Sequence, residues 1–87
     1  MKTLLFYRPN SEHERAVLEY VRDFAYRTGK ELPTVDVDSK EGIELCRLYD
    51  VVKYPTIVAI SNDGQELRRW DGDMLPQLNE VSYYFQD

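Results

Sequence analysis

The apolar positions of this 87-residue chain fall into four short runs that are typical of strands. The first, residues 3–7, is almost wholly apolar and predicts a buried strand. A second strand is predicted over residues 33–37, where valines recur at period two. Residues 57–60 form the most apolar run, and residues 65–70 follow after a turn signal, Asn62-Asp63-Gly64. These last two runs therefore predict an antiparallel hairpin.

Helical spacing separates and follows these runs. From Ser11 onward, apolar residues recur on one stripe of a helix that ends near Gly29. Ser11-Glu12-His13-Glu14 has the form of a capping box, so we expect the Ser11 hydroxyl and the Glu14 carboxylate to close the helix start. A second helix is predicted over residues 40–49, capped by Asp38 or Ser39, and a third over residues 76–85.

The predicted order is therefore strand, helix, strand, helix, strand, strand, helix. A strand-helix-strand unit gives a parallel pair with a right-handed crossover, whereas the later hairpin is antiparallel. Because the first and third strands lack a polar face, we expect helices on both faces of a mixed sheet. The length predicts one domain spanning residues 1–87.

Charge narrows the classes of partner. The chain has 16 acidic and 11 basic residues and a net charge of −5, with its lysines and arginines scattered among acids. We therefore expect no nucleic-acid partner and no anionic membrane surface. No apolar run approaches the roughly 20 residues that span a bilayer. The apolar run at the start is too short for a signal peptide and is followed by Arg8 and Pro9.

The chain has one cysteine, Cys46, and one histidine, His13. One cysteine excludes an internal disulfide and a multi-cysteine metal site, and it fits a reducing cytoplasm. Cys46 is interpreted as a small buried core residue, with a one-thiol redox site as the alternative. His13 is interpreted as an exposed first-turn residue, with a base or metal ligand beside Glu12 or Glu14 as the alternative. We expect no metal and no cofactor.

Three segments together resemble the thioredoxin family in its minimal form, over nearly the whole chain. Residues 6–15 look like its first core strand, active-site loop and helix opening. Tyr49-Asp50-Val51 and Tyr54-Pro55-Thr56 look like its Tyr-Gly-Val and Ile-Pro-Thr segments, and residues 62–72 look like its closing hairpin. The resemblance implies the thioredoxin-like fold, βαβαββα, with a four-stranded mixed sheet, helices on both faces and a cis peptide bond before Pro55.

The departures from this family fall on its redox residues. Aligned without gaps, the two catalytic cysteines correspond to Ser11 and Glu14, the preceding tryptophan to Asn10, and the buried aspartate to Leu5. A serine hydroxyl cannot form a disulfide and stays protonated near neutral pH, and a leucine cannot accept a proton. The sequence therefore predicts no catalytic residue and no dithiol oxidoreductase activity.

The resemblance then implies a non-catalytic binding or adaptor module for a protein or an extended peptide, with the backbone of Tyr54 pairing with the partner. The expected binding surface comprises Arg8, Asn10, Ser11, Glu12, His13, Tyr54, Pro55, Thr56, Gly72 and Asp73. A purely architectural turn at Pro55 is the alternative. The chain is expected to be a monomer or a homodimer, the dimer forming through the hairpin edge or through the last helix with Tyr83 and Tyr84.

Overall fold

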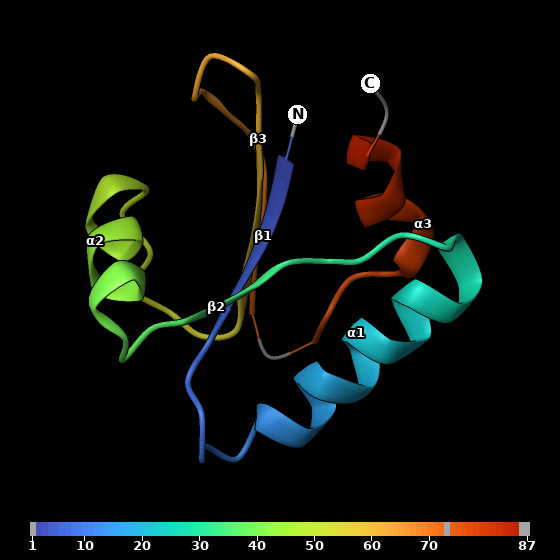
Figure 1. Cartoon of the computed structure of the whole chain (residues 1–87), viewed down its shortest axis with the longest axis horizontal. Coiled ribbons are helices and arrows are strands. Elements are labelled where there is room, and N and C mark those ends of the chain that lie inside the picture. The colour runs from blue at the N-terminus through green and yellow to red at the C-terminus, as the bar shows by residue number, and fades with distance from the viewer. Residues whose placement is uncertain (1, 73, 86–87) are drawn as a thin grey trace.

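A computed structural model describes residues 2–72 and 74–85 of the chain (Figure 1). Its elements follow the predicted order, and a short 3₁₀ helix extends the last of them. They are β1 (Lys2–Tyr7), α1 (Glu14–Thr28), β2 (Thr34–Asp36), α2 (Lys40–Leu48), β3 (Thr56–Ile60), β4 (Glu66–Asp71), α3 (Leu78–Ser82) and the 3₁₀ helix η1 (Tyr83–Phe85). None of the helices among the described residues is long and apolar enough to cross a membrane.

The four strands form one mixed sheet in the order β2-β1-β3-β4. β1 pairs with β2 in parallel and with β3 antiparallel, and β3 pairs antiparallel with β4. The predicted parallel first pair and antiparallel hairpin are confirmed. At the hairpin turn the Gly64 N–H donates to the Ser61 carbonyl at 3.0 Å. Gly64 has a φ of 88°, a left-handed conformation that glycine adopts without steric cost.

Helices cover both faces of the sheet, with α2 on one side and α1 and α3 on the other (Figure 1). Successive side chains of β1 alternate between two hydrophobic clusters, because side chains along a strand point to opposite faces. The cluster under α2 contains Leu4, Phe6, Val35, Val37, Val51, Val58 and Ile60. The cluster under α1 and α3 contains Leu5, Val17, Phe24, Leu32, Ile57 and Val81. Burial from both sides explains why neither β1 nor β3 has a polar face.

The start of α2 was predicted correctly. Ser39 is its N-cap, and its hydroxyl accepts a hydrogen bond from the Gly42 N–H at 2.9 Å. Gly42 lies so close to the end of β2 that a Cβ atom built on it would be 1.8 Å from the Asp36 carbonyl oxygen. A side chain at this position would prevent the helix from packing there.

The predicted capping box at Ser11-Glu12-His13-Glu14 is wrong. α1 begins at Glu14, with His13 as an N-cap residue that makes no side-chain cap hydrogen bond. The Ser11 hydroxyl instead donates to the Arg8 carbonyl at 2.5 Å. Asn10 has a φ of 61°, so the chain turns here before helical geometry can begin. The last predicted helix is also shorter than expected, because α3 starts at Leu78 and gives way to η1 at Tyr83.

Candidate functional site

The loop that joins β1 to α1 is closed by its own hydrogen bonds. The Arg8 N–H donates to Nε2 of His13 at 3.2 Å, and the Arg8 carbonyl accepts from the Ser11 hydroxyl. The Glu14 N–H then donates to the Ser11 carbonyl at 3.3 Å. Both polar groups of the Arg8 backbone are thus bonded within the loop. The arrangement fixes the point from which the Arg8 side chain leaves the chain.

The Arg8 side chain connects three segments that are distant in sequence. Its guanidinium carbon lies 5.2 Å from the centroid of the Tyr54 ring. Its Nε lies 3.4 Å from Oδ1 of Asp38, between β2 and α2, and the Arg8 side chain is 52% exposed. Exposed cation–π contacts and surface ion pairs each contribute at most about 1 kcal/mol. Arg8 is therefore oriented by several weak contacts while its charge still faces solvent.

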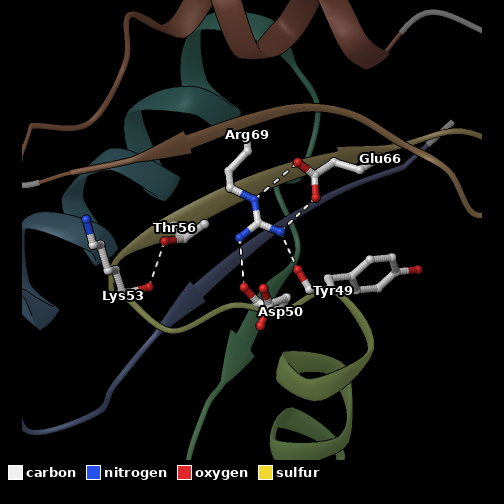
Figure 2. Close-up of polar contacts among 6 residues, drawn as sticks. All are labelled: Tyr49, Asp50, Lys53, Thr56, Glu66 and Arg69. Atoms are coloured by element: carbon white, nitrogen blue, oxygen red, sulfur yellow. Dashed lines mark hydrogen bonds and ion pairs between the residues drawn. The ribbon is translucent and has the colours of Figure 1, made fainter.

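The segment before β3 brings Tyr54 and Pro55 to this loop. The Tyr54–Pro55 peptide bond is cis, Pro55 is buried and Tyr54 is half-buried. Thr56 is also buried, and its hydroxyl donates to the Lys53 carbonyl at 2.6 Å (Figure 2). Within residues 2–72 and 74–85, no backbone hydrogen bond engages the N–H or the carbonyl of Tyr54.

Cys46 lies on α2, half-buried against the hydrophobic cluster under that helix. The Tyr54 hydroxyl donates a hydrogen bond to its sulfur. Burial raises the pKa of the Cys46 thiol, and this effect outweighs the hydrogen bond from Tyr54 and the positive charge of Arg8, which lower it. Burial also raises the pKa of Tyr54, as does the neighbouring thiol. A thiol with a raised pKa is a poor nucleophile at neutral pH, so this environment disfavours one-thiol chemistry.

The structure brings only part of the expected surface together. Arg8 and Tyr54 are in contact, whereas the Thr56 hydroxyl is buried and bonded to Lys53. Ser11 and His13 hold the loop through their side chains, and Asn10, Glu12 and Gly72 are exposed. Asp73 lies outside the described residues. Among residues 2–72 and 74–85, no group of three or more His, Cys, Asp or Glu side chains could hold a metal ion.

Arg69 anchors the C-terminal end of α2 to β4 (Figure 2). Nη1 donates to the Asp50 carbonyl at 3.0 Å, and Nη2 donates to the Tyr49 carbonyl. The Glu66 carboxylate accepts from Nε at 3.2 Å and from Nη2 at 2.7 Å. The hydrogen bonds to the Glu66 carboxylate raise the pKa of Arg69. A basic residue satisfying the last carbonyls of a helix is a common cap.

The alternation of side chains along β4 could have predicted that Arg69 faces α2. Arg69 pairs with Val58, and Val58 belongs to the cluster under α2. The sequence could therefore have placed the guanidinium on the α2 face, where helix carbonyls need donors. An open depression of about 540 Å³ beside it is lined by Leu48, Tyr49, Asp50, Gly64, Glu66 and Arg69. Because Nε, Nη1 and Nη2 of Arg69 all donate within the chain, this depression has no free cationic group from Arg69.

Comparisons with known proteins identify the architecture. No protein-family model matches the chain, and no curated protein sequence matches it. Thioredoxin 1 from the thermophilic eubacterium Thermosipho africanus is 19% identical, with a TM-score of 0.67 over 98% of this chain and 90% of that protein. A malarial protein is 22% identical, with a TM-score of 0.67 over 95% of this chain and 90% of that one. A designed protein is 22% identical, with a TM-score of 0.63 over 97% of this chain and 71% of that one.

Identities this low establish shared architecture, and the strand order and helix placement described above agree with it. The chain has the thioredoxin-like fold.

Proposed function

We propose that this chain is a redox-inactive thioredoxin-like module that binds an extended segment of a partner protein along Tyr54, beside the Arg8 loop. The observation that carries the proposal is the hydrogen bond that the Ser11 hydroxyl makes within the loop. By the sequence resemblance, this position corresponds to a reactive cysteine, and here its hydroxyl donates to the Arg8 carbonyl. The group at that position thus holds the loop closed.

The free backbone of Tyr54 supports the binding half of the proposal. An extended peptide adds to a protein by pairing its own N–H and carbonyl groups with unpaired backbone groups. Among the described residues, Tyr54 offers both groups without an internal partner. Pro55 next to it is buried, which fixes the position of this backbone against the sheet. The exposed part of the Tyr54 ring adds apolar surface for a partner side chain.

A selection experiment tests the binding half. Random 12-residue peptides displayed on phage would be selected on the immobilised protein, and selected peptides titrated into ¹⁵N-labelled protein. We expect amide shifts centred on Arg8 and Tyr54 and weaker binding by Tyr54→Ala. Tyr26→Ala is the matched control, because Tyr26 is 89% exposed on α1. Failure to select a peptide, or shifts confined to other surfaces, would contradict the proposal.

A reduction assay tests the redox half. Insulin reduction by dithiothreitol should proceed no faster with the protein than with the reagent alone, because the chain has one cysteine and cannot cycle an internal disulfide. A catalysed rate would overturn this half of the proposal. The single, half-buried thiol and the acidic net charge support a place in a reducing compartment, such as the cytoplasm, and a protein partner in preference to nucleic acid.

A further inference from the structure

The Arg8 guanidinium has donors to spare. A guanidinium carries five N–H groups. Within the described part of the chain, the Arg8 side chain has one ion-pair partner, Asp38, which approaches Nε at 3.4 Å. The hydrogen bonds of Arg8 in that part of the chain involve its backbone N–H and carbonyl, and neither Nη group donates one. The Nη groups of Arg8 are thus free to donate to a ligand. They lie beside Tyr54, whose backbone N–H and carbonyl have no partner among the described residues.

Arg69 and Arg15 differ from Arg8 in this respect. Arg69 donates from all three of its nitrogens to groups within the chain. Arg15 has a single partner, Glu19, and its side chain is 91% exposed, so nothing holds it in one orientation. Arg8 combines an oriented guanidinium with unused donors. Arg68 is a close structural parallel, since it lies 5.0 Å from the Trp70 ring and 3.9 Å from Glu80. However, Arg68 lies within β4, whose backbone is paired with β3.

Resting on the proposed function, we infer that Arg8 selects partner segments carrying a carboxylate near the residue that pairs with Tyr54. The two Nη groups of a guanidinium match the two oxygens of a carboxylate, and this bidentate geometry is stronger and more directional than a neutral hydrogen bond. Stacking on Tyr54 and the contact with Asp38 reduce the side-chain freedom that binding would otherwise remove.

The net negative charge of the chain restricts this preference for a carboxylate to one position of the bound peptide. With a net charge of −5, the protein as a whole repels an acidic segment. Arg8 provides positive charge over the Tyr54 ring, and the exposed Lys53 directly precedes Tyr54 in the chain. A carboxylate is therefore favoured at one place along the bound peptide, and acidic residues elsewhere in it gain nothing. The carboxylate could belong to a Glu or Asp side chain or to the end of a peptide, and the chemistry is the same.

The test uses peptides selected as described above, resynthesised in matched forms. One position at a time carries Glu, Gln or Lys, and each form is made with a free and with an amidated C-terminus. We expect one position at which Glu binds about tenfold more tightly than Gln, a typical worth for a charge-assisted pair. Tight binding of the Glu peptide with an amidated C-terminus identifies a side-chain carboxylate as the group that is recognised. Tight binding of the Gln peptide with a free C-terminus identifies the terminal carboxylate.

Variants assign the preference to Arg8. Arg8→Gln should bind the Glu and Gln peptides equally, and Arg8→Lys should keep only part of the preference, because an ammonium lacks the fork. Arg68→Gln, which removes a stacked and ion-paired arginine elsewhere, should leave the preference unchanged. Peptide binding without a carboxylate preference, or a preference that survives in Arg8→Gln, would overturn this inference and leave the proposed function standing. A lack of any peptide binding would overturn both.

Discussion

Arg69 donates to the carbonyl of Asp50 from a strand that lies nineteen positions further along the chain, and it thereby closes the end of α2 (Figure 2). Its side chain is only 22% exposed. Asp50 has a φ of 54°, so the backbone leaves helical geometry there. Arg69 satisfies the Asp50 carbonyl together with the Tyr49 carbonyl and orders the edge of the sheet at the same time.

Replacing this arginine should destabilise the fold. Arg69→Met removes the donors to two carbonyl groups and leaves the Glu66 carboxylate without its partner. We expect a loss of about 1–2 kcal/mol in the free energy of unfolding, measured with urea. Arg68→Met is the matched control and should cost less than about 0.5 kcal/mol, because its ion pair with Glu80 is long and exposed. Equal losses in the two variants would show that Arg69 is not a structural anchor.

Gly42→Ala should destabilise the protein although the residue lies in a helix. Alanine at a helical glycine usually stabilises by about 1 kcal/mol. Here the added Cβ would meet the Asp36 carbonyl oxygen at 1.8 Å, so α2 or the end of β2 must move. We expect a net loss of about 1–3 kcal/mol, the usual cost of overpacking. Glu44→Ala, an exposed position of α2, is the control in the same urea experiment. A stabilised Gly42→Ala variant would contradict the packing described.

The Cys46 thiol should react slowly in the folded protein. Burial raises its pKa, so near pH 8 a smaller fraction is thiolate than in the unfolded chain. Alkylation by iodoacetamide should therefore be slower without urea than with it, and the pH–rate profile should shift to higher pH. Tyr54→Phe removes a hydrogen bond that lowers the thiol pKa and should shift the profile further upward. Rapid alkylation of the folded protein at pH 7 would support the one-thiol alternative.

Tyr20 should make the fold sensitive to alkaline pH. Burial, with a contribution from Glu80, raises its pKa from 10.0 to about 12. The raised pKa means that the folded state holds its proton longer than the unfolded state does. The stability it contributes is complete below pH 10 and is lost as pH rises towards 12.

The corresponding measurement compares urea midpoints at pH 9 and pH 11 in the natural chain and in Tyr20→Phe. The natural chain should lose more stability between these two values than the variant, because phenylalanine does not ionise. The other tyrosines are common to both proteins and cancel in the difference. An identical loss in both would show that the Tyr20 phenol titrates alike in the folded and unfolded states.

Sequence patterns predicted correctly the features that depend on contacts between residues a few positions apart. Ser39 caps α2 as expected because its hydroxyl needs only the amide of Gly42, three positions away. The same kind of signal failed at Ser11, since a serine hydroxyl can serve a turn as well as a helix end, and the φ of Asn10 decides between them. Nothing local to Ser11 distinguishes these outcomes.

Side-chain contacts between segments that are distant in the chain could not be predicted from the sequence. Arg8 contacts Tyr54, and Arg69 contacts Asp50, only after the sheet has brought together segments that are distant in the sequence. The family resemblance predicted that the loop lies near Pro55. It did not predict that His13 accepts a hydrogen bond from the Arg8 N–H. A histidine at the start of a helix gives no pattern that marks its ring as bonded to the preceding loop.

Leu5 has a consequence for how this fold could change. It is fully buried among side chains such as Val17 and Ile57, at the position that the resemblance assigns to an acidic residue. A carboxylate there would lie among these apolar side chains, at a cost of several kcal/mol. Cysteines introduced at positions 11 and 14 would thus supply sulfur but no proton acceptor at position 5. A redox-active variant of this chain would therefore need changes in the buried interior as well as in the loop.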